Sequence, residues 1–391
     1  MEYSPVFKGK TIVIDARFLD PKKAGISRYT RELIKGITRI KTGAKWIVIV
    51  KNGEKFEDDF KDALDKSKDT IELIGTDIGH YTLSEQREFL KLLNNLKPDL
   101  IHFTNFNHPV RLKRPFVTTI HDLIMSKNPT SNRSRVRNFA YNYVMRNAVK
   151  RSKLILTVSN YSKRDIVTEY KIVPDKVMVT YNGIDTHRFR PISNPTRLNA
   201  VLAKYKIDKP YILNVGQWMK HKNLYALVDA MERLNAELKY KGKYQLVIAG
   251  RPREYDAMVE YIKAKNLESV VLLPGFVDET DLPILYNAAR LFAFPSLAEG
   301  FGIPPLEAMA CGTPVVSSNA TCMPEVLGDA ALYFDPRNVK NITEVIIAGL
   351  TNTSLRDKCI KKGLTQASRY RWQETVDGTL KAYEKVLTRL K

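Results

Sequence analysis

Cysteine and long apolar runs are what this sequence has least of. Its three cysteines are too few and too scattered for a disulfide framework or a metal knuckle, which predicts a reducing, cytoplasmic compartment: Cys311, Cys322 and Cys359. No run reaches the roughly 18 apolar residues that a membrane-spanning helix needs. Residues 1–10 lack the apolar segment of a secretory signal. We therefore expect neither a transmembrane helix nor a secretory leader.

Acidic residues are missing between Asp122 and Asp165. Ten cations fall in that stretch: Lys127, Arg133, Arg135, Arg137, Arg146, Lys150, Arg151, Lys153, Lys163 and Arg164. The whole chain has a formal net charge of +21, and residues 1–190 hold 36 Lys+Arg against 21 Asp+Glu. This imbalance indicates an anionic partner: a membrane, a nucleic acid or a phosphorylated acceptor. A generally basic protein with solvated helix faces would show the same composition, so both explanations stay open.

Short apolar runs alternate with helix-length segments along the whole chain. The predicted strands are Thr11–Asp15, Trp46–Val50, Leu100–Phe103, Phe116–Ile120, Leu154–Val158, Tyr211–Val215, Gln245–Ala249, Val270–Leu273, Leu291–Phe294 and Pro314–Ser317. The predicted helices are Gly25–Thr38, Leu83–Leu96, Asn138–Lys150, Leu224–Glu237, Asp281–Ala289 and Ile303–Ala310. This alternation over 391 residues predicts two doubly wound α/β domains with parallel sheets. Strand patterns lapse between 186 and 209, which predicts a linker near 188–198.

Ligands of open α/β sheets bind at the carboxyl ends of the strands, so the residues that follow each strand matter most. Gly25 opens a helix after the first strand, and His121 and Asp122 follow the fourth. Gly216 follows the strand at 211–215 and precedes Lys220, His221 and Lys222 at a helix start, a plausible pyrophosphate site. Each of these features alone also fits an ordinary turn. The dinucleotide fingerprint of several glycines is absent after the first strand.

The most informative segment follows the strand Leu291–Phe294. Gly300 and Gly302 bracket a helix start, where backbone N–H groups can face an anion or sugar oxygens. Glu299 lies before this helix and Glu307 lies inside it. Two carboxylates beside a phosphate site are costly unless they accept hydrogen bonds from hydroxyls, which indicates a sugar-containing ligand.

Taken together, these segments resemble the family-4 retaining glycosyltransferases of the GT-B fold. The resemblance runs in order through GISRYTREL (25–33), HDL (121–123), TVSNYSKRDI (157–166), YNGID (181–185), NVGQWMKHKNL (214–224), GFVDETDL (275–282) and the segment 294–336. It is closest to bacterial mannosyl- and rhamnosyltransferases of surface polysaccharide synthesis. It implies two Rossmann-like domains facing a cleft: residues 1–190 on the acceptor side, and 198–374 binding the nucleotide sugar. A C-terminal helix at about 375–391 would cross back to the first domain.

The resemblance also implies roles for individual residues. The glutamate matching Glu299 contacts the donor sugar, the lysine matching Lys222 neutralises the diphosphate, and the histidine matching His121 lies near the reaction centre; these three are the expected catalytic residues. The expected donor-binding residues are Gly25, Gly216, His221, Arg251, Phe276, Val277, Gly300, Phe301, Gly302 and Glu307. In one departure, Gln217 stands where many members carry an arginine. The second cation would then be His221, Lys220 or none.

The expected reaction moves a hexose, with mannose favoured, from a GDP- or UDP-sugar to a glycan or polyprenyl-linked (lipid-linked) acceptor, with retained anomeric configuration. No metal or other cofactor is expected, because no metal-ligand motif follows a strand. Nucleic acid is not an expected partner, whereas an anionic membrane on the inner face of the cell is. Two alternatives stay open: a nucleotide-sugar epimerase of the same architecture, and a basic nucleic-acid-binding protein.

Overall fold

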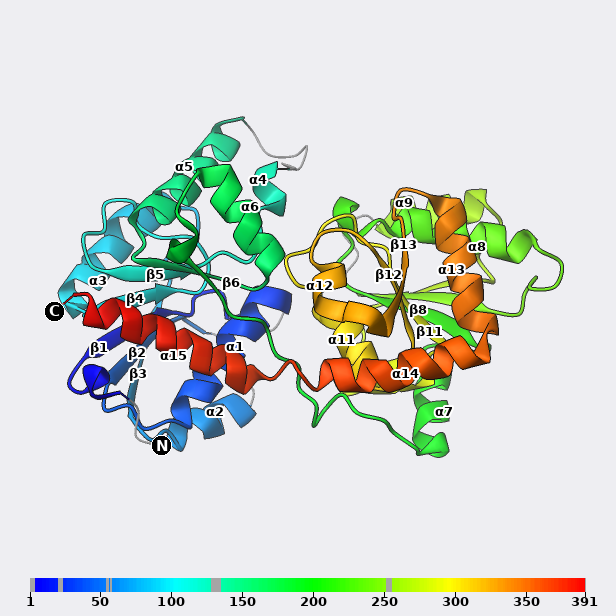
Figure 1. Cartoon of the computed structure of the whole chain (residues 1–391), viewed down its shortest axis with the longest axis horizontal. Coiled ribbons are helices and arrows are strands. Elements are labelled where there is room, and N and C mark those ends of the chain that lie inside the picture. Colours follow the sequence, from blue (N-terminus) through cyan, green and yellow to red (C-terminus); the bar gives the residue numbers. More distant parts are fainter. Residues whose placement is uncertain are drawn as a thin grey trace. The chain divides into compact units, whose positions relative to one another are not determined.

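A computed structural model describes residues 4–19, 24–53, 56, 58–127, 135–250 and 255–390. The chain forms two compact units: unit 1 is Met1–Gly183 with Trp372–Lys391, and unit 2 is Ile184–Arg371 (Figure 1). The boundary lies at residue 183, earlier than the linker expected near 188–198. The residues after it are packed rather than extended as a linker. Ile184 N donates to Tyr370 O at 3.0 Å, and the buried Phe189 ring contacts Tyr286 at 5.8 Å.

Unit 1 is built on a parallel sheet of seven strands in the order β3-β2-β1-β4-β5-β6-β7. The strands are β1 Thr11–Asp15, β2 Lys45–Lys51, β3 Thr70–Thr76, β4 Leu100–Phe103, β5 Phe116–Thr119, β6 Leu154–Thr157 and β7 Val177–Val179. The central strands are buried on both faces, as their continuous apolar sequences predict. The strand order reverses between β1 and β4, so the loops after these strands border the place where such sheets bind ligands.

Helices cover both faces of this sheet. They are α1 Ala24–Thr38, α2 Asp58–Asp65, α3 Leu90–Leu96, α4 Ile124–Lys127, α5 Arg135–Arg151, α6 Asn160–Tyr170 and α15 Trp372–Thr388. One turn of π-helix, Glu85–Phe89, precedes α3. The last helix, α15, packs on α1 so closely that a side chain at Gly36 would lie 2.2 Å from Val376 Cγ2. The C-terminal helix is therefore part of unit 1 and begins slightly earlier than the expected 375.

Unit 2 contains a six-stranded sheet in the order β10-β9-β8-β11-β12-β13. The strands are β8 Tyr211–Val215, β9 Gln245–Ala249, β10 Val271–Gly275, β11 Leu291–Phe294, β12 Val315–Ser318 and β13 Ala331–Phe334. The helices are α7 Pro195–Lys204, α8 Leu224–Ala236, α9 Tyr255–Ala264, α10 Leu282–Ala288, α11 Ile303–Ala310, α12 Met323–Leu327, α13 Val339–Thr351 and α14 Thr353–Ala367. The order reverses between β8 and β11, which are the strands that carry the expected donor loops.

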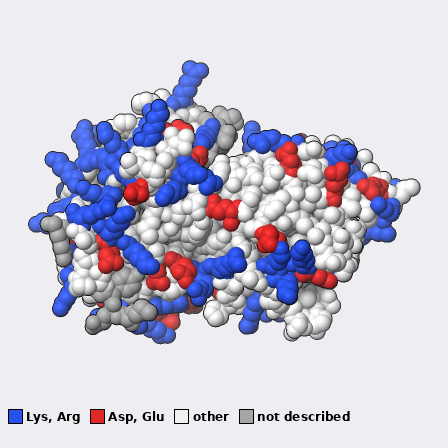
Figure 2. Space-filling view, viewed as in Figure 1, with Lys and Arg blue, Asp and Glu red and all other residues white. Residues whose placement is uncertain are grey.

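Basic side chains are unevenly distributed over the surface. On the face shown in Figure 2, Lys and Arg gather over unit 1. Among the residues that the structure describes, no helix is long and apolar enough to span a bilayer.

Candidate functional site

The loops after β8 and β11 meet where the strand order of unit 2 reverses. Lys222 Nζ donates to Glu299 Oε1 at 2.6 Å. Two further hydrogen bonds join the same loops: Leu297 N donates to His221 O at 2.7 Å, and Asn223 Nδ2 donates to Pro295 O at 3.2 Å. The structure therefore brings Lys222, His221 and Glu299 together, although Lys222 and Glu299 are 77 residues apart in sequence.

The Lys222–Glu299 pair is mostly withdrawn from water, with side chains that are 20% and 10% exposed. The backbone of Glu299 is fixed from both sides: its N–H donates to Thr321 Oγ1 at 3.1 Å, and its carbonyl accepts from Cys322 Sγ at 3.2 Å. The sequence did not predict these contacts of Thr321 and Cys322 with Glu299. The pair offers one cation and one carboxylate to a ligand at the same point.

His221 is the remaining candidate for a second cation beside Lys222, since Lys220 is exposed. Burial lowers the pKa of His221 below its usual value, the charge of Lys222 lowers it further, and Glu299 opposes them. These effects favour the neutral form of His221, which can offer a diphosphate a hydrogen bond.

Glycine is required at one position of the predicted helix start. Gly302 has φ +81°, and a side chain there would lie 2.8 Å from Met323 Cε. Phe301 is buried with its ring edge-on to Tyr370 at 5.4 Å, so its side chain belongs to the core and only its amide is a ligand candidate. Gly300 precedes it in the same buried turn.

Glu307 lies inside α11 and is only 2% exposed. Its Oε2 accepts a hydrogen bond from Tyr286 Oη at 3.0 Å, and Tyr286 is itself fully buried on α10. Tyr286 therefore orients the carboxylate that was expected to contact the ribose. Tyr286 could not be recognised from the sequence, because a buried tyrosine is typical of an ordinary core.

The other expected donor contacts of unit 2 differ in exposure. Gly216 continues the sheet by donating its N–H to Ala249 O at 3.0 Å, and a side chain there would meet nothing within 4 Å. Of the pair expected near the base, Phe276 is exposed and Val277 is buried, which leaves Phe276 as the accessible side chain. Arg251 lies outside the described residues.

In unit 1, His121 follows β5 at the carboxyl edge of the sheet. Its Nε2–H donates to Thr104 O at 3.0 Å, because a carbonyl can only accept. Burial lowers the pKa of His121 to about 4, so the ring is neutral at pH 7 and Nδ1 is an acceptor. The ring lies edge-on to that of Tyr29, with 5.0 Å between centroids.

A buried chain of hydrogen bonds supports this part of the sheet. Tyr29 Oη and Thr119 Oγ1 are 3.0 Å apart, Thr119 Oγ1 and His102 Nε2 are 2.8 Å apart, and His102 Nδ1 and Tyr383 Oη are 2.5 Å apart. The chain thereby ties β4, β5 and α1 to α15. It fixes the ring of Tyr29 against His121, and the sequence did not predict it.

Gly25 is the second residue of α1 and is exposed. A side chain there would meet nothing within 4 Å. The described structure thus gives no packing reason for glycine at position 25, as at Gly216.

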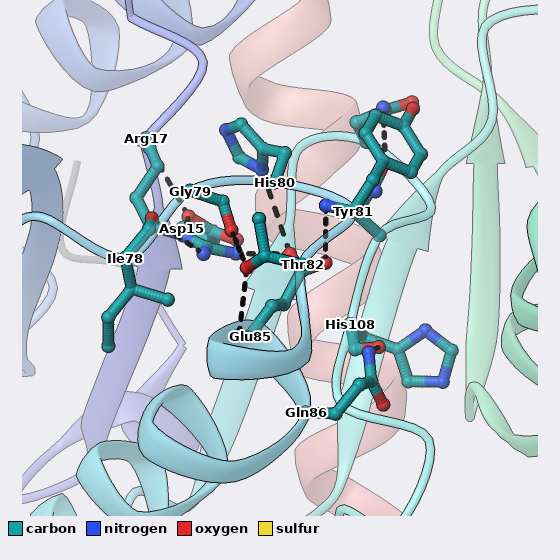
Figure 3. Close-up of polar contacts among 12 residues, drawn as sticks. Asp15, Arg17, Ile78, Gly79, His80, Tyr81, Thr82, Glu85, Gln86 and His108 are labelled. Carbon is teal, nitrogen blue, oxygen red and sulfur yellow. Dashed lines mark hydrogen bonds and ion pairs between the residues drawn. The ribbon is translucent and has the colours of Figure 1, made fainter.

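A second polar cluster, which the sequence did not predict, lies where the strand order of unit 1 reverses (Figure 3). Arg17 donates to Asp15 through Nε and Nη2, each at 2.8 Å, and Nη2 also donates to Glu85 Oε1 at 2.8 Å. All three side chains are buried. Burial alone would raise the pKa of Asp15, but the charge and hydrogen bonds of Arg17 outweigh it and hold the pKa below its usual value.

We searched the described residues for side chains that could bind a metal ion together. Among these residues, no three His, Cys, Asp or Glu side chains are grouped as metal ligands.

Comparison with known proteins identifies the family. A model described as Glycosyltransferase Family 4 matches residues 24–188, and one described as Glycosyl transferases group 1 matches residues 201–366. The chain is 35% identical over 307 residues to O-antigen chain mannosyltransferase B of Escherichia coli, which covers 78% of this chain and 79% of the relative.

One further relative and one solved structure are also similar to this chain. O-antigen chain mannosyltransferase RfbU of Salmonella typhimurium is 29% identical over 235 residues, covering 60% of this chain and 61% of the relative. The structure of HepE from Anabaena in complex with UDP and glucose matches with a TM-score of 0.74, covering 96% of this chain and 100% of that chain at 17% identity. This chain belongs to the family-4 glycosyltransferases and has their GT-B architecture of two parallel-sheet α/β domains.

Proposed function

We propose that this glycosyltransferase moves mannose from a nucleotide diphosphate sugar, a GDP- or UDP-sugar, to a growing cell-surface polysaccharide. The sugar and the acceptor class are inferred from the two relatives named as O-antigen chain mannosyltransferases. The Lys222–Glu299 pair at the strand-order reversal of unit 2 is the observation that carries the proposal. It supplies a cation for a diphosphate and a carboxylate for sugar hydroxyls.

In the proposed reaction, the bond between the anomeric carbon and the diphosphate oxygen breaks, and the acceptor oxygen bonds to the same face of the sugar. The acceptor proton passes to the departing diphosphate. Lys222 and the backbone N–H groups at the start of α11 stabilise the negative charge that develops there. Glu299 binds donor hydroxyls, Glu307 binds the ribose, and neutral His121 accepts a hydrogen bond near the anomeric carbon. A metal is not needed in this scheme.

An assay with defined donors and acceptors tests this proposal. Purified protein is incubated with GDP-mannose, UDP-glucose, TDP-rhamnose or ADP-glucose, each with and without an oligomannoside acceptor and with and without EDTA. We expect acceptor-dependent release of GDP, a product heavier by one hexose, the anomeric configuration of the donor in its NMR spectrum, and no effect of EDTA. Turnover of donor without acceptor would indicate an epimerase instead, and an inverted product would overturn the retaining mechanism.

We also propose that unit 1 lies on an anionic membrane through α5, beside a lipid-linked acceptor. Val136, Phe139 and Tyr143 are exposed, and their spacing of three and four residues places them on one face of this helix. Exposed cations flank this apolar face: Arg135, Arg137, Arg146 and Lys150. Each cation near an anionic surface contributes about 1 kcal/mol. Arg133 lies outside the described residues.

The structure narrows which residues of α5 can take part. Met145 is fully buried, and Tyr141 and Val144 pack against the core, so these three do not belong to the proposed membrane face. Co-sedimentation with vesicles should show binding that rises with anionic lipid and falls with salt. Replacing Arg135, Arg137, Arg146 and Lys150 by Ser should weaken it. Equal binding to neutral and anionic vesicles, or no binding at low salt, would overturn the proposal.

A further inference from the structure

Three aromatic side chains gather at the carboxyl edge of the sheet in unit 1. Tyr81 lies in the loop after β3, Phe106 lies in the loop after β4, and Tyr141 lies on α5. The rings of Tyr81 and Tyr141 are nearly parallel, with 6.2 Å between their centroids. The centroid of the Phe106 ring lies 4.8 Å from that of Tyr141 and 6.2 Å from that of Tyr81. Phe106 is buried, Tyr141 is half-buried and Tyr81 is 53% exposed. The Tyr81 ring therefore packs against two other aromatic rings and keeps part of its surface open to solvent.

The backbone holds Tyr81 in a conformation that its side chain disfavours. Its φ is +60°, a left-handed value that is unfavourable for a bulky residue. The Tyr81 N–H donates to Glu85 Oε2 at 2.9 Å, and Glu85 is held in turn by Arg17 (Figure 3). The other described non-glycine residues with positive φ are lysines, asparagines and one threonine, so Tyr81 is the one aromatic side chain among them. Strain that is maintained at an exposed aromatic ring points to a functional reason for presenting it.

The neighbouring residue, His80, packs against the loop after β1. The ring of His80 stacks on Phe18 with 3.5 Å between centroids. Its two ring nitrogen atoms are buried without a hydrogen-bond partner among the described residues, and Nδ1 stops 3.7 Å from Glu85 Oε1. Buried polar atoms without partners are rare in folded proteins, so His80 is an unusual neighbour for an exposed aromatic residue.

The loop that carries Phe106 also accepts a hydrogen bond from the residue expected to act at the reaction centre. Phe106 is two residues beyond Thr104, whose carbonyl accepts the hydrogen bond from His121. Gln86 fixes the loop that carries Phe106: its Nε2 donates to His108 O at 3.2 Å, and its Oε1 accepts from Val110 N at 2.9 Å. Tyr81, Phe106 and His121 thus belong to successive loops at one edge of one sheet.

We propose that Tyr81, backed by Tyr141 and Phe106, is a stacking platform for a pyranose ring of the acceptor glycan. One face of a pyranose presents C–H bonds with partial positive charge, and an aromatic face is negative, so the two attract while the sugar hydroxyls stay in water. Asp15, Arg17 and Glu85 are positioning residues that set the angle of the platform. The identity of the occupant rests on the proposed function above.

The test compares Tyr81→Asn with Tyr81→Phe. Asn tolerates a left-handed backbone and Phe keeps the ring, so Tyr81→Asn removes stacking without adding strain. We expect Tyr81→Asn to weaken the binding of an oligomannoside, measured by NMR titration, about tenfold, and to raise the acceptor KM by a similar factor. The donor KM should stay unchanged, and Tyr81→Phe should bind like the wild type. Val173→Asn, at an exposed apolar residue of unit 1 with no proposed role, is the control and should leave oligomannoside binding unchanged.

The outcomes separate this inference from the proposed function. If the wild type transfers sugar and Tyr81→Asn binds the oligomannoside as the wild type does, the platform is wrong and the proposed function stands. If oligomannoside binding depends on Tyr81 but no donor is turned over, the platform stands and the proposed function fails. Equal losses in Tyr81→Asn and Val173→Asn, or a wild type that does not bind the oligomannoside, would overturn the platform.

Discussion

Lys222 and Glu299 neutralise each other across two loops of unit 2, and this arrangement determines what single substitutions do. Lys222→Ala removes the cation and leaves a 10% exposed carboxylate without its ammonium. We expect kcat/KM to fall, because the transition state loses roughly 2–4 kcal/mol of stabilisation when one preorganised charge is removed. Steady-state kinetics would measure it, with Lys220→Ala on the same loop as an exposed control. Near wild-type turnover of Lys222→Ala would remove it from the diphosphate site.

Substitutions of the two glutamates, Glu299 and Glu307, should change different kinetic constants. Glu307→Gln should mainly raise the donor KM, because a neutral amide accepts ribose hydroxyls less strongly than a carboxylate. Glu299→Gln should reduce kcat more than it raises KM, since it also frees Lys222. Tyr286→Phe is a useful comparison, because it removes the hydrogen bond to Glu307 and keeps the ring. If both Gln variants lose stability and keep their kinetic constants, the pair is structural.

Buried histidines should make stability depend on pH. Burial lowers the pKa of His121 to about 4 and that of His102 to about 3, whereas an unfolded histidine titrates near 6.5. Below pH 6.5 the unfolded chain therefore binds more protons, so the free energy of unfolding falls as the pH falls and is greatest above 6.5. Urea unfolding between pH 7.5 and 5 would measure this slope.

Two variants show whether His102 contributes to the slope. His102→Gln should reduce the slope, because one titrating group is gone. Tyr383→Phe removes the hydrogen bond to His102 and should lower stability at every pH while keeping the slope. A free energy of unfolding that does not change between pH 6.5 and 5 would contradict the assignment.

At the scale of elements, the loops that begin helices contain glycines of two kinds. Gly302→Ala should lower the free energy of unfolding by about 1–3 kcal/mol, because it adds a left-handed alanine and a clash with Met323. Gly216→Ala meets nothing within 4 Å and should change stability by less than about 0.5 kcal/mol. It should nevertheless weaken nucleotide binding, because the new methyl occupies the approach to the loop. Unchanged nucleotide affinity of Gly216→Ala would show that this glycine does not face the donor.

At the scale of the whole molecule, the chain passes through unit 2 before it completes unit 1. Leu380 is fully buried in the core of unit 1 on α15. Leu380→Ala should destabilise unit 1 by about 2–5 kcal/mol through the cavity it leaves. Hydrogen exchange should then speed up in unit 1 alone, with nucleotide binding to unit 2 preserved and Lys381→Ala as an exposed control. Faster exchange spread equally over both units would show that they unfold together.

Local sequence patterns predicted the central strands and the starts of helices α8 and α11. Strands β1, β4, β8, β9 and β11 have the predicted bounds, because a strand buried on both faces is mostly apolar. Helix α11 also has its predicted bounds, marked by the glycines before it and the prolines of its first turn. The loops that matter could be found without coordinates, because a strand's carboxyl end is fixed once the strand is known.

The edge strands of the sheets and the long-range side-chain pairs became visible only in the folded structure. Strands β3, β7 and β13 were not predicted, and each lies at an edge of its sheet, paired on one side. Lys222 and Glu299, Arg17 and Glu85, and His102 and Tyr383 lie 77, 68 and 281 residues apart. Local periodicity reports which face of an element is buried. It carries no information about which distant side chain lies opposite, and that pairing sets the charges, the pKa values and the strain at Tyr81.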